Sequence, residues 1–146
     1  MHSNKAKILI VDDEPALRES LSQIFIACGY RVCCAHDGFS ALDEMKKELP
    51  DLILSDLNMP GMSGFDFLSI VRSGFPAIRA IAMSGAFTGS EVPSGVSADA
   101  FYEKGTGMRG LLHIVESAIR PRGTARDSGR VPAALNESAL WTPPEA

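Results

Sequence analysis

Six polar residues of this chain are candidates for chemistry because each follows a hydrophobic segment. They are Asp12, Asp13, Glu14, Asp56, Ser84 and Lys104. The types are carboxylates, one hydroxyl and one ammonium group. Carboxylate oxygens suit a hard cation, and a cation, an ammonium and a hydroxyl together can neutralise the oxygens of a phosphoryl group. Metal-assisted phosphoryl transfer is therefore the first hypothesis.

The acidic residues need a counter-charge if the fold brings them together. Two carboxylates about 4 Å apart repel by roughly 4 kcal/mol at an effective dielectric constant near 20. Proton uptake relieves such repulsion, and so does Mg²⁺, which binds a few protein oxygens and keeps several waters. We favour Mg²⁺. With Lys104 and Ser84 beside the ion, one carboxylate would be free to attack a phosphoryl group.

Short apolar segments alternate with helix-period segments over residues 1–120, which is typical of βαβ units in a parallel sheet. The five predicted strands are Lys7 to Val11, Arg31 to Ala35, Leu52 to Ser55, Ile78 to Met83 and Ala100 to Tyr102. In an open α/β sheet the chemistry lies beyond the carboxyl ends of the strands. All the candidate residues fall at that edge. A glycine-rich phosphate loop is missing after the first strand, where the chain is acidic instead, so we do not expect a phosphate cradled there.

Apolar residues at helical spacing predict four helices between and after these strands. The predicted core residues are, helix by helix, Leu17, Leu21, Ile24, Phe25 and Cys28; Phe39, Leu42 and Met45; Phe65, Leu68 and Val71; and Met108, Leu111, Leu112, Val115, Ala118 and Ile119. The crossover after the fourth strand reads GAFTGSEVPSG, so we expect a short or frayed helix there. Residues 121–146 contain four prolines and are expected to form a flexible tail.

The composition narrows the class of protein. Fourteen Lys and Arg against 18 Asp and Glu give a net charge of -4, which offers no footprint for direct nucleic-acid binding. No apolar run approaches the roughly 20 residues that span a bilayer, and no signal peptide is evident, so a cytoplasmic location is expected. Cys28, Cys33 and Cys34 lack zinc-ligand spacing and are interpreted as buried thiols.

Two motifs resemble the receiver domain of bacterial response regulators. ILIVDDEPALR, from Ile8 to Arg18, is similar to the acidic pair of that family, and DLILSDLNMPGMSG, from Asp51 to Gly64, is similar to its phosphoacceptor strand and loop. AMSGA and AFYEKG match more loosely. The resemblance covers Lys7 to about Arg120. It implies the flavodoxin-like strand order 2-1-3-4-5 with helices on both faces of the sheet.

The resemblance also implies a role for each residue. Asp56 would accept a phosphoryl group from a histidine kinase, a histidine phosphotransfer protein or a small phosphodonor. Asp13 and Asp56 would ligate Mg²⁺ directly, Asp12 would act through water, and the backbone carbonyl of Asn58 would complete the protein ligands. Lys104 would pair with the phosphoryl oxygens. Ser84 would bond the phosphoryl group after transfer, and Phe101 would change rotamer behind it, although Phe101 could equally be a core aromatic residue.

One residue departs from the family pattern. Receivers usually have proline after the lysine, commonly through a cis bond, whereas this chain has Gly105. A cis bond before a residue other than proline costs about 2.5 to 4 kcal/mol. We therefore expect a trans or mobile link, and a less firmly aimed Lys104.

The sequence leaves three functions open. The first is a stand-alone receiver that is not an enzyme beyond its own phosphorylation and dephosphorylation, and that switches contacts with an unidentified downstream protein. The second is a degenerate receiver that binds partners without phosphorylation, suggested by Gly105 and the weak crossover helix. The third is a small Mg²⁺-dependent phosphatase with an Asp nucleophile, for which Asn58 stands where a second acid is usual.

Overall fold

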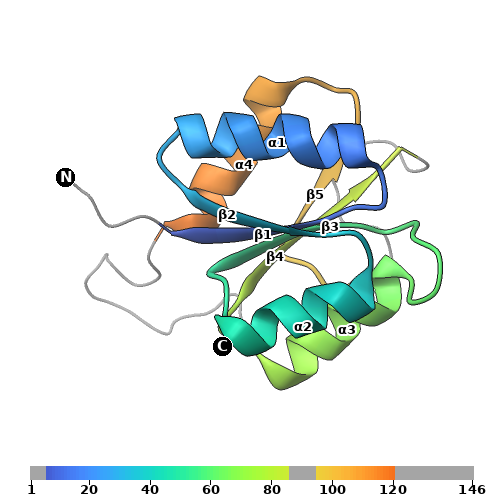
Figure 1. The fold of residues 1–146 in the computed structure, drawn as a ribbon. Coiled ribbons are helices and arrows are strands. Elements are labelled where there is room, and N and C mark those ends of the chain that lie inside the picture. Colours follow the sequence, from blue (N-terminus) through green and yellow to red (C-terminus); the bar gives the residue numbers. More distant parts are fainter. Residues whose placement is uncertain (1–5, 86–94, 121–146) are drawn as a thin grey trace.

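The computed structural model describes residues 6–85 and 95–120 and places five strands and four helices in them (Figure 1). In chain order these elements are β1 (Lys7–Val11), α1 (Pro15–Ala27), β2 (Arg31–Ala35), α2 (Gly38–Lys47), β3 (Leu52–Asp56), α3 (Gly64–Gly74), β4 (Arg79–Ser84), β5 (Ala100–Glu103) and α4 (Met108–Ile119). Among these described residues no helix is both long and apolar enough to cross a membrane.

The strands form one parallel sheet in the order β2-β1-β3-β4-β5, which confirms the predicted fold class. β1 and β2 have the predicted bounds. β3, β4 and β5 each end one residue later than predicted, because the ladder continues by one pair: Asp56 lies opposite Met83, and Ser84 opposite Glu103. Asp56 and Ser84 are therefore the last residues of their strands, where the sheet itself fixes their backbones.

Alternation along the strands divides the core into two layers. Leu9, Val11 and Ile53 face one side of the sheet, which α2 and α3 cover, and Ile8, Ile10 and Leu54 face the other, which α1 and α4 cover. Figure 1 shows these two helix pairs on opposite faces of the sheet. Strands buried on both faces are continuously apolar, which is why these runs could be recognised in the sequence.

The predicted core stripe of α2 is wrong at its first residue. Met45 is buried, but Phe39 is 60% exposed, and Ala41 is the fully buried residue of the first turn. A helix turns about 100° per residue, so a three-residue repeat drifts by about 60° per step and carries Phe39 off the buried face. Ala41 and Met45, four residues apart, stay on it.

The cysteine interpretation is also wrong in part. Cys28 is exposed, while Cys33 and Cys34 are partly buried, and all three are free thiols. Cys28 lies at the C-cap of α1, just past the end of the helix. Burial raises the pKa of the Cys33 thiol, and Glu44 adds to that rise while Lys7 opposes it.

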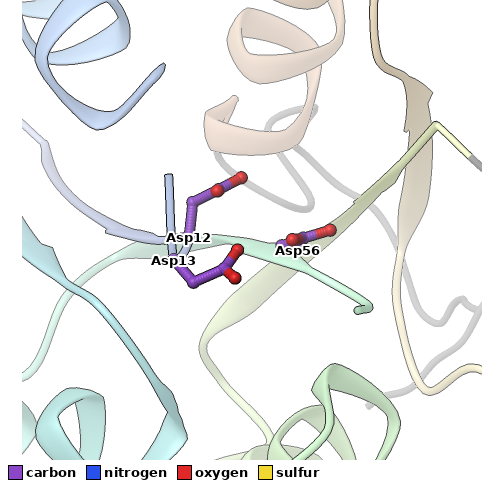
Figure 2. A group of neighbouring side chains, drawn as sticks. All are labelled: Asp12, Asp13 and Asp56. Carbon is purple, nitrogen blue, oxygen red and sulfur yellow. The ribbon is translucent and has the colours of Figure 1, made fainter. Parts of the chain in front are cut away.

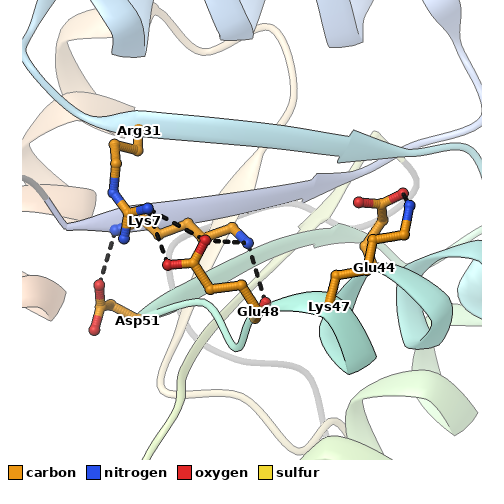
Figure 3. Close-up of polar contacts among 6 residues, drawn as sticks. All are labelled: Lys7, Arg31, Glu44, Lys47, Glu48 and Asp51. Carbon is orange, nitrogen blue, oxygen red and sulfur yellow. Dashed lines mark hydrogen bonds and ion pairs between the residues drawn. The ribbon is translucent and has the colours of Figure 1, made fainter.

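Opposite charges are paired at the amino edge of the sheet (Figure 3). The Lys7 ammonium donates to the Glu48 carbonyl at 3.0 Å and lies 3.3 Å from its carboxylate, which also pairs with Arg31 at 2.9 Å. The Lys7 backbone N–H donates to the Asp51 carboxylate at 2.8 Å. Hydrogen bonds from Arg31 and Lys7 lower the pKa of Glu48. This edge fixes the start of β1 and the end of α2.

Two expectations lie outside the described residues. The short or frayed crossover helix falls mainly on residues 86–94, and the described part of that connection, residues 95–99, contains no helix. The proline-containing tail is residues 121–146. Neither expectation is tested by this structure.

Candidate functional site

Three carboxylates meet at the carboxyl edge of the sheet (Figure 2). Asp12 and Asp13 follow β1, and Asp56 ends β3. One oxygen from each lies within 4.8 Å of the other two. This is the one group of three or more potential metal ligands found among the described residues. The sequence prediction that separate turns bring these side chains together is confirmed.

Asp12 is fully buried and held from two sides. Its Oδ1 accepts a hydrogen bond from the Glu14 backbone N–H at 2.8 Å, and its carbonyl accepts one from the Arg18 guanidinium at 2.6 Å. Asp13 is exposed and does not cap α1, whose N-cap is Glu14 without a side-chain cap bond. Because its carboxylate does not cap the helix, Asp13 can bind a ligand.

Asp56 lies almost fully buried beside an ammonium group. Its Oδ2 is 3.3 Å from the Lys104 Nζ, and its Oδ1 accepts from the Asn58 backbone N–H at 3.3 Å. Burial raises the pKa of Asp56, Lys104 opposes that rise, and the charge of Asp12 adds to it. Ionised Asp56 therefore carries an electrostatic cost that a further cation would relieve.

Lys104 links the two buried carboxylates, with its Nζ 2.9 Å from Asp12 and 3.3 Å from Asp56. Burial alone would lower the pKa of Lys104, but Asp12 and Asp56 outweigh it and the pKa is raised. The ammonium is thus charged at neutral pH. Glu14 is more remote, 3.9 Å from Nζ and exposed.

No cis peptide bond occurs among the described residues, so the link before Gly105 is trans as expected. The expectation of a less firmly aimed Lys104 side chain stays a prediction, but the backbone of Lys104 is anchored. Its backbone N–H donates to the Ser84 carbonyl at 3.0 Å, which continues the sheet pairing up to Lys104 itself. Gly105 takes a φ of 87°, a conformation that glycine adopts without strain, so the chain turns only after the lysine is fixed.

The two residues predicted to form the switch, Ser84 and Phe101, lie on neighbouring strands. Ser84 is fully buried, and its hydroxyl accepts a hydrogen bond from the Asn58 side-chain amide at 3.2 Å. Phe101 is 2% exposed and packs in the core layer on the α2 and α3 side. The position of Phe101 fits a core role and a switch role alike.

Sequence reasoning missed the part that Gly64 plays in the site. Gly64 begins α3, and its N–H donates to the Leu57 carbonyl at 3.0 Å. A Cβ at Gly64 would lie 2.0 Å from the Asp56 carbonyl oxygen and 2.6 Å from the Leu57 Cα. The signal was present in the sequence as the glycine that ends the second motif, but spacing alone does not reveal a close backbone approach.

Gly64→Ala is expected to destabilise the fold by about 1 to 3 kcal/mol, because the backbone behind Asp56 must shift to admit the methyl group. Urea unfolding measures the effect. Gly74→Ala is the matched control at the other end of α3, where an added Cβ meets nothing within 4 Å. Equal effects of the two substitutions would contradict the close approach.

The donor set fits a hard divalent cation. Among the described residues the buried Asp12 Oδ2 has the Lys104 ammonium, 2.9 Å away, as its ion-pair partner. One ammonium cannot balance the charge of three clustered carboxylates. All three clustered residues offer oxygen, the ligand that Mg²⁺ prefers. Asp12, Asp13 and Asp56 are thus suited to hold such an ion.

Comparisons with known proteins identify the family of this chain. The family profile of the response regulator receiver domain matches residues 8–115. Sporulation initiation phosphotransferase F of Bacillus subtilis is 42% identical over 78 residues, covering 53% of this chain and 63% of the relative. The chain spans 17% to 63% of the length of the curated relatives it matches first.

Solved structures share the fold over most of the chain. Chemotaxis response regulator CheY4 of Vibrio cholerae has a TM-score of 0.72 at 32% identity, covering 79% of this chain and 99% of CheY4. A chain in the complex of histidine kinase ThkA with response regulator TrrA, a protein of Thermotoga maritima, has a TM-score of 0.71 at 28% identity, covering 78% of this chain and 98% of that one. With the profile match, these findings establish that the chain belongs to the response regulator receiver family of two-component systems.

Proposed function

We propose that this chain is a phosphoacceptor in which Asp56 takes up a phosphoryl group in a Mg²⁺-dependent reaction. The observation that supports this most strongly is the pairing of a buried carboxylate with two different kinds of neighbour. Asp56 has the Lys104 ammonium at 3.3 Å and oxygens of Asp12 and Asp13 within 4.8 Å. A purely structural acid would need only the lysine.

The metal ligands in this proposal are Asp13 and Asp56 directly, Asp12 through water, and the backbone carbonyl of Asn58. The cation, when bound, would neutralise charge on the carboxylates and on the incoming phosphoryl oxygens. The clustering of three carboxylates around one lysine and the exposure of Asp13 support this assignment.

In the transfer step, a carboxylate oxygen of Asp56 attacks phosphorus and forms a mixed anhydride. The bond from phosphorus to the leaving group breaks, and its electron pair stays with the leaving group, a histidine nitrogen of a protein donor or the carboxylate oxygen of acetyl phosphate. Lys104 pairs with the phosphoryl oxygens as charge shifts onto them. The attack needs the ionised form of Asp56; burial raises the pKa of this carboxyl, and the charge of Lys104 opposes that rise.

The aspartyl phosphate then changes protein contacts. It adds negative charge and three acceptor oxygens, and Ser84 and Phe101 are the residues we propose respond to it. The donor is a histidine kinase or histidine phosphotransfer protein, as the relative TrrA crystallised with the kinase ThkA suggests. The downstream partner is a protein, the exchange takes place in the cytoplasm, and the chain turns over no other substrate.

Incubation with acetyl phosphate and Mg²⁺, followed by intact-mass spectrometry, tests this proposal. The mass is expected to rise by one phosphoryl group, and the same incubation with EDTA should leave it unchanged. An unchanged mass at high donor and Mg²⁺ concentrations would contradict the proposal and favour the degenerate receiver. Steady turnover of p-nitrophenyl phosphate without retained phosphate would favour the phosphatase.

Mg²⁺ is also expected to stabilise the fold, since the unfolded chain cannot gather the three carboxylates. At ten times its dissociation constant a ligand stabilises by about 1.4 kcal/mol. Thermal unfolding with MgCl₂ and with EDTA measures the gain. Asp13→Asn should lose most of it, whereas Asp43→Asn, which changes an exposed carboxylate of α2, should retain it. A gain that Asp13→Asn leaves intact would contradict this metal site.

A further inference from the structure

We propose that residues 131–142 of this chain bind an apolar groove that lies along α2, with Leu135, Leu140 and Trp141 as the side chains that enter it. The segment lies outside the described residues, and the groove lies within them. The proposal is independent of the phosphoacceptor function, because the groove contains none of the residues assigned to the metal or to the phosphoryl group.

The groove follows α2 and is closed by the C-cap residue of α3. Its volume is about 530 Å³, and apolar side chains dominate its lining: Phe39, Leu42, Met45, Leu49 and Phe75. Phe39 is 60% exposed and Leu49 is 51% exposed, so large apolar side chains face water here. A contiguous apolar surface of this kind marks a site that another segment or molecule covers.

Residues 131–142 are the apolar part of the chain beyond α4. Residues 121–130 contain three arginines and one aspartate but no large apolar side chain, whereas residues 131–142 contain Val131, Leu135, Leu140 and Trp141. Large aliphatic and aromatic side chains gain free energy when they leave water. The segment therefore has the composition of a groove ligand, and the residues before it have the composition of a linker.

The linker is long enough to bring the segment to the groove. α2 and α4 both run back to the amino edge of the sheet, where they end on opposite faces (Figure 1). Fourteen residues, 121–134, separate Arg120 from Leu135. Fully extended they span at most about 50 Å, and a small domain is about 30 Å across. They can therefore carry Leu135 around this edge to Leu49.

The charges of the segment and the groove are complementary. Lys46 lies on the rim of the groove with its side chain 79% exposed. Glu137 is the one charged residue among residues 131–142, and it lies between Leu135 and Leu140. If both leucines enter the groove, Glu137 comes to its rim beside Lys46. Apolar burial then supplies most of the affinity, and the charge pair favours one orientation of the segment.

Fluorescence of the full chain in EDTA tests the proposal, because Trp141 is the single tryptophan. Its emission is expected to be blue-shifted from that of the urea-unfolded chain. Phe39→Ser should lower the ratio of bound to free segment about tenfold, since it removes a large apolar side chain from the contact. The emission should then move toward the unfolded value, and Leu49→Ser should act in the same direction. Ile26→Ser is the matched control, since Ile26 is 58% exposed on α1, on the opposite face of the sheet.

Methyl NMR gives the reciprocal measurement. Trp141→Ser is expected to shift the methyl resonances of Leu42 and Leu49 and to leave those of Ile26 in place. Unshifted leucine methyls, or an emission that Phe39→Ser and Ile26→Ser change equally, would overturn the proposal. A blue shift that disappears on dilution would assign the groove to the segment of a second copy and would overturn it as well. Neither measurement uses Mg²⁺ or a phosphodonor, so a failure here leaves the proposed function untouched.

Discussion

Asp56→Asn is expected to abolish phosphoryl uptake completely while making the metal-free fold more stable. The first effect follows because an amide cannot form the mixed anhydride. The second follows from the buried carboxylate, since burial raises the pKa of Asp56 and makes its ionisation more costly in the folded state than in the unfolded chain. Replacing the ionised group by an uncharged one of the same size removes that cost and leaves Lys104 paired with Asp12.

The pH dependence of this effect has a definite sign. A folded-state pKa above the unfolded value of about 4 means that the neutral carboxyl contributes its full stability below that value and loses it as pH rises through the folded pKa. The gain from Asp56→Asn should therefore be largest at neutral pH and vanish in acid. Urea unfolding in EDTA measures it, with exposed Asp43→Asn as a control expected to show no such gain.

Mg²⁺ should oppose the stability advantage of Asp56→Asn over the wild type. The wild type gains a ligand for the ion and the variant loses one, so the stability difference should shrink or change sign in MgCl₂. A variant that is less stable than the wild type in EDTA at neutral pH would contradict the electrostatic description of the site. A variant that still gains a phosphoryl group would contradict the assignment of the acceptor.

Lys104→Met is expected to cost about 3 kcal/mol of stability in EDTA, because removal of one partner leaves a buried charge without compensation. Asp12 is fully buried and the Lys104 side chain 21% exposed, so the lysine is the main counter-charge of both carboxylates. The rate of phosphoryl uptake should fall about 10²-fold, the effect of removing one preorganised donor from a charged transition state.

Urea unfolding and the time course of acetyl phosphate labelling measure these two effects. Lys46→Met is the matched control, since Lys46 and its partner Asp43 are 79% and 72% exposed at 3.6 Å. Such a surface pair contributes between about 0 and 1 kcal/mol. Equal effects of the two lysine substitutions on stability would contradict the claim that Lys104 is the main counter-charge of Asp12 and Asp56.

The sheet is predictable from the sequence because its inner strands are buried on both faces and so contain short apolar runs. Ile8 to Val11 is the clearest case. The buried faces of the helices are harder to predict. Phe39 is apolar like the buried residues of α2, but it lies at the margin of the apolar stripe and is exposed. The predicted strand ends are wrong where a polar residue, Asp56 or Ser84, continues the ladder. The end of an apolar run therefore does not mark the last residue whose backbone pairs in the sheet.

The candidate site is predictable as far as topology governs it. Parallel strands place their carboxyl ends at one edge, so Asp12, Asp13 and Asp56 had to converge. Contacts that depend on side-chain direction cannot be foreseen in this way, among them the Asn58 bond to Ser84 and the Arg18 bond to the Asp12 carbonyl. The backbone bond from Lys104 to the Ser84 carbonyl is a further contact that the sequence does not reveal.

Peptide mapping of the phosphorylated chain after borohydride reduction tests the central claim most directly, because reduction converts an aspartyl phosphate to homoserine and marks the residue that carried it. After labelling with acetyl phosphate and Mg²⁺, homoserine is expected at position 56 alone. Homoserine at position 12 or 13, or an unreduced aspartate at position 56 in fully labelled protein, would contradict the proposal that Asp56 is the phosphoacceptor.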